Sequence, residues 1–176
     1  MSSIALDPTL VGVLRASLAW ILLLAAIHKL RDPRAFADVV AGYRLVPDAA
    51  AAPAALALAG AELVAGAALC VPAGGRFGAR SAALLLSLYA GAIAVNLLRG
   101  RRAIACGCGL APRPLGAGLV LRNAMLAVLA LAASRPGAPR AQGFVDAWTI
   151  AFGSVTAVLL FAAADAAAAR RARAHA

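Results

Sequence analysis

Two cysteines separated by a single glycine, Cys106 and Cys108, are the residues of this chain whose type and spacing are best suited to chemistry. Glycine stands between them and after them, so the backbone there can adopt turn conformations that other residues avoid. A disulfide across one intervening residue closes a very small ring, and strained bridges are more oxidising and tend to be labile or catalytic. The pair therefore indicates a thiol–disulfide exchange centre.

The basic surroundings of Cys106 and Cys108 favour the same chemistry. The segment 99–114 that contains them also holds four arginines: Arg99, Arg101, Arg102 and Arg113. Positive charge favours thiolate over thiol, and thiolate is the attacking species in exchange. Two other interpretations stay open, namely reduced, inert cysteines in a glycine-rich turn and a soft-metal site for Cu(I) or zinc. A metal would be short of ligands, because His28 and His175 are the only histidines.

The third cysteine, Cys70, is predicted to be separate from this pair. It ends the second long apolar run of the sequence, whereas Cys106 follows the third. In an up-and-down bundle those two ends lie on opposite faces of the membrane, about 30 Å apart. We therefore expect Cys70 to be a buried structural thiol.

A second group of polar residues falls inside the apolar runs. Glu62 lies in the middle of one run, where a carboxylate is costly unless it is paired or protonated. Arg122 is the expected partner of Glu62, and Asn96 and Asn123 are expected to complete a polar cluster. Such a cluster could handle protons or orient a ligand, for example a quinone headgroup as cofactor, or it could be an ion pair that fixes helix register. We expect Arg15 to extend to the membrane interface instead.

Composition predicts that these residues sit in an integral membrane protein of one domain. The chain has 176 residues, of which 64% are hydrophobic and 14% charged, whereas a soluble domain has about 45–50% apolar and about 25% charged residues. Apolar content this high also excludes a disordered chain. The net charge is +10, but the basic residues fall mostly between apolar runs, as membrane topology places them, so we expect no nucleic-acid binding.

The apolar runs predict the fold class, an all-α polytopic membrane bundle. A spanning helix needs roughly 17–25 mostly apolar residues. Five runs approach this length, and since the last is rich in alanine we expect four to five transmembrane helices: about 10–27, 49–71, 79–98, 116–133 and 147–164. No basic region precedes the first run, so it is predicted to span rather than to be a signal peptide. Residues 165–176 are expected to form a basic C-terminal tail.

A short interfacial helix is predicted after the first span. Asp32 followed by Pro33 is a helix start, because the carboxylate caps the helix and proline suits the first helical position. Apolar residues then recur at helical spacing: Phe36, Val39, Val40 and Tyr43. Gly42 and Pro47 are expected to end this helix.

Several segments together resemble the methylamine utilisation protein MauE family, a DoxX-like group of redox-associated membrane proteins. The matching segments are HKLRDP at 28–33 with Phe36, YRLVP at 43–47, EL at 62–63, NLLRGR at 96–101, CGCG at 106–109 and RN at 122–123. They cover about residues 10–133, and the Cys-Gly-Cys segment is the most specific of them. The sequence departs from the family at Ala105, where an acidic residue is common, and at Gly109-Leu110, which replace a Phe-Gly pair.

The resemblance implies a multi-pass protein of the cell (inner or plasma) membrane that supports thiol–disulfide exchange. It implies a role in maturing a disulfide-containing client, such as an amine dehydrogenase subunit in methylamine utilisation, together with a thioredoxin-like partner. Together with the polar residues inside the runs, this gives the leading hypothesis, a relay in which Cys106 and Cys108 exchange disulfides and electrons pass to a quinone near Glu62 and Arg122.

The side of the membrane that Cys106 and Cys108 face is predicted differently by charge and by resemblance. Eleven Lys and Arg residues fall on the side of the first connection, the cysteine segment and the tail, against four on the other side. This bias places the cysteines in the cytoplasm, whereas maturation of an exported protein needs them outside, where disulfides persist. Four resolutions are open: the count misleads, the fifth segment does not span, the cysteine loop re-enters the bundle, or the chemistry is cytoplasmic. The resemblance favours the outer side.

Two functions of other classes are alternatives to the relay. A non-catalytic assembly or scaffold subunit would hold a partner by close helix packing at small residues: Gly60, Ala61, Gly66 and Gly91. It predicts tolerance of cysteine loss and sensitivity to a bulky residue at Gly66. A small transporter would need helices broken near the midplane, and Pro53, the only proline within a run, lies near an end.

Overall fold

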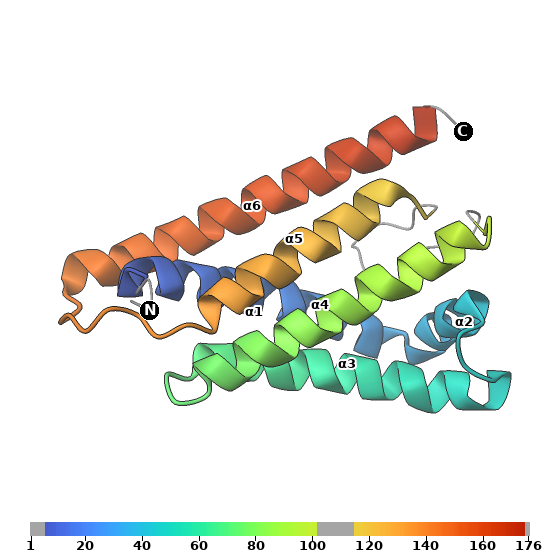
Figure 1. Cartoon of the computed structure of the whole chain (residues 1–176), viewed down its shortest axis with the longest axis horizontal. Coiled ribbons are helices and arrows are strands. Elements are labelled where there is room, and N and C mark those ends of the chain that lie inside the picture. The colour runs from blue at the N-terminus through green and yellow to red at the C-terminus, as the bar shows by residue number, and fades with distance from the viewer. Residues whose placement is uncertain (1–5, 102–114, 175–176) are drawn as a thin grey trace, which may run out of the picture.

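The computed structural model describes residues 6–101 and 115–174, and every regular element in those ranges is a helix (Figure 1). There are six helices: α1 (Pro8–Arg31), α2 (Pro33–Tyr43), α3 (Asp48–Cys70), α4 (Gly75–Leu98), α5 (Ala117–Ala133) and α6 (Phe144–Ala174). Four of them, α1, α3, α4 and α6, are long and apolar enough to cross a membrane, and α5 is a shorter apolar helix. The predicted all-α membrane bundle, with a short helix after the first span, is confirmed.

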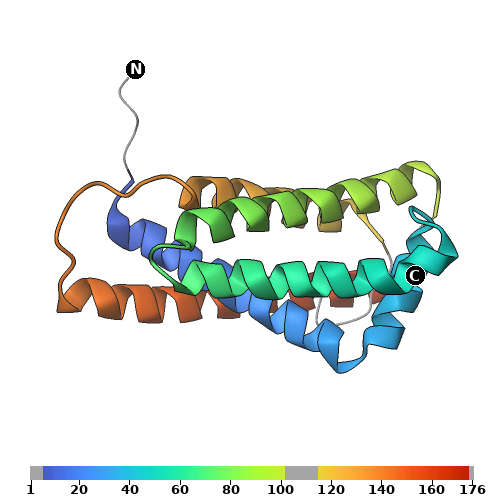
Figure 2. The same cartoon turned by 90° about the horizontal axis from the view of Figure 1, so that it is seen from below.

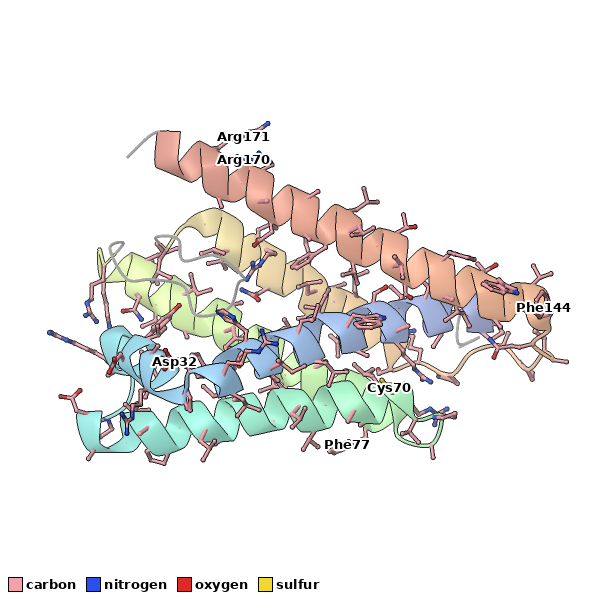
Figure 3. All side chains as sticks on the ribbon, turned by 180° about the vertical axis from the view of Figure 1, so that it is seen from behind. Asp32, Cys70, Phe77, Phe144, Arg170 and Arg171 are labelled. Atoms are coloured by element: carbon pink, nitrogen blue, oxygen red, sulfur yellow. The ribbon has the colours of Figure 1, made fainter. Side chains whose placement is uncertain are left out.

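The five helices other than the short α2, referred to below as the five long helices, form two layers. Figure 2 shows α4 and α5 side by side above α1, α3 and α6. Helix α1 is central, because it packs against α3 on one side and α6 on the other. Cys70, Phe77 and Phe144 lie at one end of the bundle, and Asp32, Arg170 and Arg171 lie at the other (Figure 3). We refer to these as the Cys70 end and the Asp32 end.

The two helix-start signals predicted for α2, the capping carboxylate of Asp32 and the proline at position 33, are both present. The Asp32 carboxylate accepts a hydrogen bond of 3.0 Å from the backbone N–H of Ala35, and Pro33 occupies the first helical position. The helix ends at Tyr43, and Arg44 closes it in the left-handed conformation, with φ of 48°. Phe36 and Tyr43 are the buried residues of this helix, so they direct it against α3 and the centre of the bundle.

Small residues make the interior and large apolar residues cover the exterior. Ala65, Ala79 and Ala82 are completely buried, whereas Leu84 is 72% exposed. In water such a surface would be costly, but lipid tails are as apolar as leucine, and helices in membranes associate by close packing of small residues. Helix α6 is the most exposed of the four spanning helices, since only 6% of its apolar stretch is buried inside the protein.

Helices α3 and α4 approach each other closely at Gly78. A Cβ atom there would lie 2.7 Å from the Leu69 nitrogen and 2.8 Å from the Ala65 oxygen, and neither backbone atom can move aside easily. We expect Gly78→Ala to lower the free energy of unfolding by about 1–3 kcal/mol, as other overpacked substitutions do. Gly91→Ala is the matched control on the same helix, because no atom lies within 4 Å of its Cβ position; it should stabilise α4 by about 0.5–1 kcal/mol. Denaturant titration of the purified protein in micelles measures both, and equal effects would contradict this account of the contact.

Gly66 also packs inside the chain. A Cβ atom at this position would lie 2.9 Å from the Leu23 Cγ atom of α1. The prediction that a bulky residue at Gly66 would report on packing with a partner is therefore wrong, because such a residue would first separate α1 from α3. Gly60 and Gly91 do have open space around them.

The connection between α5 and α6 is tied to the start of α1. Arg140 donates hydrogen bonds to Asp7, Thr9 and Asp146, and the Thr9 hydroxyl donates to Asp146 at 2.6 Å. A parallel bridge joins Leu6 to Gly137. These contacts place the first turn of α6 beside the first turn of α1 at the Cys70 end.

This connection predicts a change in a measurable pKa. The hydrogen bonds from Arg140 and from the Thr9 backbone lower the pKa of Asp7 from its usual 3.8. The Asp7 carboxylate therefore stabilises the folded protein fully above about pH 4. This stabilisation is lost as the pH falls through the lowered pKa of Asp7. We expect Arg140→Ala to raise the pKa of Asp7 toward its usual value, as measured by NMR titration of the carboxyl carbon. Arg135→Ala is the control, and an unchanged Asp7 titration in Arg140→Ala would exclude the contact.

Candidate functional site

A cavity of about 240 Å³ lies among the five long helices. Most of its wall is apolar, with Leu22, Leu86 and Leu126 on one side and Val158 and Phe161 of α6 on the other. Six polar side chains also line it: His28, Glu62, Tyr89, Arg122, Asn123 and Asp165. An apolar pocket with a few convergent polar groups is the usual form of a small-molecule site.

Glu62 is held by two partners from other helices. Its Oε1 atom forms an ion pair with the Lys29 ammonium of α1 and accepts a hydrogen bond of 2.7 Å from the Tyr89 hydroxyl of α4. The Lys29 Nζ atom also lies 3.3 Å from the Tyr89 hydroxyl oxygen. Glu62 is 1% and Lys29 3% exposed, so the whole group is buried. These contacts join α1, α3 and α4 through one carboxylate oxygen.

Aromatic rings complete the surroundings of the Lys29 ammonium. Nζ lies 4.9 Å from the centre of the Phe36 ring of α2 and 4.7 Å from that of Tyr89. A cation at this distance from a ring is attracted by the ring quadrupole, and more strongly when it is desolvated.

The ion pair lies deep in the bundle. Glu62 is eight residues from the end of α3 at Cys70, which is about 12 Å along the helix. The ring contacts and the ion pair thus offset the cost of burying charge at membrane depth.

The second oxygen of this carboxylate has a different environment. Glu62 Oε2 is buried and accepts no hydrogen bond from any residue in the ranges 6–101 and 115–174. A buried acceptor without a donor is costly, and it commonly marks a place that a ligand or water occupies. The cavity that Glu62 lines is the space from which such a donor can approach.

Arg122 has a different partner from the one that the sequence suggested. Its Nη1 atom donates to Asp165 Oδ1 of α6 at 2.7 Å, and its guanidinium lies 5.8 Å from the centre of the Phe161 ring. The predicted ion pair of Glu62 with Arg122 is therefore wrong, although both side chains line the same cavity. Lys29 points inward from the last turn of α1 and forms the ion pair with Glu62 instead. Helix α6 continues past residue 164, so Asp165 lies within reach of Arg122.

The predicted polar cluster of Asn96 and Asn123 is divided. Asn123 lines the cavity, where its side-chain N–H donates to the Leu119 carbonyl at 2.9 Å. Asn96 is completely buried about two turns beyond Tyr89 on the same face of α4 and does not line the cavity; it donates to the Ala92 carbonyl and accepts from Arg101 at 3.3 Å. Only Asn123 therefore belongs with Glu62 and Arg122 at the cavity.

Cys106 and Cys108 lie outside the residues that the structure describes, but the chain leading to them is placed. Arg99 donates to the Arg44 carbonyl, and Arg101 donates to the Tyr43 carbonyl, each at 3.4 Å. These bonds attach the end of α4 to the end of α2. The cysteine segment therefore begins from a position at the Asp32 end that is held by two helices.

Cys70 is not the buried thiol that the sequence suggested. It is exposed, and its Sγ–H lies 3.5 Å from the Gly66 carbonyl, its only hydrogen-bond partner among the described residues. The last turn of α3 presents this side chain outward. Figure 3 places Cys70 at the end opposite Asp32, and α4 and α5 meet the cysteine segment at the Asp32 end.

Four residues of the site were missed by the sequence analysis: Lys29, Phe36, Tyr89 and Asp165. Lys29 had been counted as a loop charge. Its signal in the sequence is that it is the only lysine beside sixteen arginines. An ammonium is a more compact charge than a guanidinium, so it fits between a carboxylate and two rings. Asp165 could have been found as the one acidic residue in the alanine-rich C-terminal segment.

Comparison with known proteins gives the family of this chain. The family model described as methylamine utilisation protein MauE matches residues 7–135. A methylamine utilization protein MauE of Paracoccus denitrificans is 37% identical over 94% of this chain and 90% of its own length. The MauE proteins of Paracoccus versutus and Methylophilus methylotrophus are 40% and 38% identical, over 93% and 94% of this chain and 90% and 89% of their own. No solved structure matches. The chain belongs to the methylamine utilisation protein MauE family.

Proposed function

We propose that this protein is a thiol–disulfide relay of the cell (inner or plasma) membrane that supports maturation of a disulfide-containing client in methylamine utilisation. Cys106 and Cys108 form the exchanging pair. Their disulfide passes to a client dithiol, which becomes oxidised while Cys106 and Cys108 become reduced. An amine dehydrogenase subunit is the client that the resemblance to the family implies, and a thioredoxin-like protein is the soluble partner.

The observation that carries this proposal is the fixed entry to the cysteine segment. Arg99 and Arg101 bond backbone carbonyls at the end of α2, so two guanidinium groups are anchored where the segment begins. Exchange needs a thiolate that a partner can reach, and fixed positive charge stabilises a thiolate. The anchored arginines at the start of the segment support the second requirement, and the labelling experiment below tests the first.

Reoxidation of the cysteine pair needs an acceptor for two electrons and two protons. A membrane quinone takes up both when it is reduced to the hydroquinone. We place it at the cavity that Glu62 and Arg122 line, because this cavity is apolar and lies among the membrane-spanning helices.

The orientation that we propose has Cys106 and Cys108 on the outer side. Lys29 is buried in the bundle and is no longer a loop charge, so the basic residues at the Asp32 end number ten instead of eleven, still against four. Arg99 and Arg101 are two of those ten, and their bonds to α2 give them a structural role independent of topology. Without these two arginines the count is eight against four, so the bias toward a cytoplasmic Asp32 end is smaller than the sequence count suggested.

Labelling of intact cells with a membrane-impermeant maleimide tests this arrangement. The background is Cys70→Ser, because the exposed Cys70 would otherwise react. We expect labelling only after prior reduction, which would place an oxidised Cys106–Cys108 pair outside. Labelling that appears only after the membrane is opened would reject exchange on the outer side.

A scaffold function is the second proposal, favoured by the open space at Gly60 and Gly91. No atom lies within 4 Å of a Cβ position at either glycine, so a partner helix could approach α3 and α4 closely there. A scaffold predicts that Gly91→Leu abolishes client maturation while the cysteine variants retain it. The relay predicts the opposite pattern, and the same assay of client maturation distinguishes the two.

A further inference from the structure

The charges at the cavity are already balanced by one another. Glu62 is paired with Lys29, and Arg122 is paired with Asp165. A charged ligand would bring an additional charge into a region where unpaired charge is costly. The occupant that fits this cavity is therefore uncharged.

The unsatisfied oxygen of Glu62 defines the polar group of the occupant. Because Oε2 is a buried acceptor to which no described residue donates, it is complemented by a hydrogen-bond donor. A hydroxyl group is an uncharged donor that lipid-soluble molecules carry. A carbonyl oxygen at the same place would face the carboxylate with lone pairs on both sides, so Oε2 discriminates a hydroxyl from a carbonyl.

The size of the cavity and its walls define the rest of the occupant. A volume of about 240 Å³ exceeds the roughly 150 Å³ of an engineered apolar cavity that binds benzene, so it accommodates one substituted ring. Leucine side chains and Phe161 supply apolar contacts for such a ring. Helix α6 provides one wall and is largely exposed along its span, so the cavity is separated from lipid by a single helix.

We propose that this cavity binds a ring-sized hydroquinone through its hydroxyl group to Glu62 Oε2, in preference to the oxidised quinone. The inference rests on the proposed function for the biological role of the ligand. Preferential binding of the reduced form raises the midpoint potential of the bound couple, by about 30 mV for each tenfold difference in affinity. The bound quinone is then a stronger oxidant for a dithiol than the free quinone.

The test is a binding measurement on the full-length protein in lipid nanodiscs under oxygen-free conditions. A short-chain benzoquinone is titrated calorimetrically in its reduced and its oxidised form. We expect the reduced form to bind at least about tenfold more tightly, the size expected for one hydrogen bond to a charged group. In Glu62→Gln an amide replaces the carboxylate and can donate to a carbonyl, so the preference should disappear or reverse. Equal affinity of both forms in the unmodified protein, or absence of binding, overturns the proposal.

A pair of neighbouring alanines on α6 controls for the place of binding without changing the ion pairs. Ala162 lines the cavity, whereas Ala163 is exposed and does not. Ala162→Leu should weaken hydroquinone binding at least tenfold, because it fills the site, and Ala163→Leu should leave binding unchanged. Equal affinities of the two variants would exclude this cavity as the site.

The binding proposal and the relay can fail separately. Cys106→Ser should bind hydroquinone as the unmodified protein does, because the proposed hydrogen bond is made to the Glu62 carboxylate and not to a thiol. If Ala162→Leu loses client maturation while its cysteines are still labelled at the surface, ligand binding at the cavity is required for the disulfide relay.

Discussion

The Cys106→Ser and Cys108→Ser variants are each expected to reduce formation of the client's disulfides to the background level. The physical reason is that exchange requires both sulfurs, one to form the mixed disulfide and the other to resolve it. The measurement is the fraction of oxidised client in cells, resolved by thiol trapping and gel mobility. Membrane levels of each variant are measured in parallel, so that loss of function is not confused with loss of protein.

Cys70→Ser is the matched control for these variants. Cys70 is an exposed thiol at the opposite end of the bundle from the entry to the cysteine segment, and we expect its replacement to leave client oxidation near the level of the unmodified protein. Normal client oxidation in both Cys106→Ser and Cys108→Ser would reject the relay and leave the scaffold function. A loss in Cys70→Ser equal to theirs would show that the assay reports folding.

Glu62→Ala is expected to lower the free energy of unfolding by about 3–5 kcal/mol, which is the usual cost of leaving one member of a buried ion pair without its partner. The Lys29 ammonium would remain 3% exposed among Phe36, Tyr89 and the helix backbones. Its attraction to the two rings is already present in the unmodified protein, so it does not replace the lost carboxylate. Denaturant titration in mixed micelles, followed by circular dichroism, measures the loss.

The double variant Lys29→Met, Glu62→Ala separates the ion pair from simple packing. Because it leaves no buried charge, it should recover much of the stability that Glu62→Ala loses. Asp38→Ala is the control for removal of a carboxylate, since Asp38 is exposed on α2 and should change stability by less than about 0.5 kcal/mol. A double variant that is less stable than Glu62→Ala would show that Lys29 does not depend on the carboxylate.

Helix α6 contributes to the cavity although it lies outside the residues that the family model matches. The family model ends at residue 135, before α6 begins at Phe144. Yet α6 contributes Asp165, the partner of Arg122, and Phe161, which lies near the Arg122 guanidinium. The curated relatives match over about nine tenths of this chain, a length that includes part of α6.

The fold class and the helices of this protein are determined by local features of its sequence. Long apolar runs specify spans because the membrane core demands length and low polarity. The Asp32-Pro33 cap specifies where α2 begins, because the capping carboxylate acts on an N–H only three residues away. The same local logic identified Glu62, since a carboxylate within an apolar run is visible without knowing its neighbours.

The partners of the buried charges were decided only by the tertiary structure. Glu62 and Arg122 are opposite charges in the second and fourth apolar runs, and no local pattern around them shows that Lys29 is the partner of Glu62. The distinction depends on the rotation of α1, which turns Lys29 inward, and on the length of α6, which carries Asp165 to Arg122. The outward orientation of Cys70 depends in the same way on the rotation of α3. A pairing between distant helices is set by their packing, because helix rotation and register follow from the summed contacts of every face and not from any one residue.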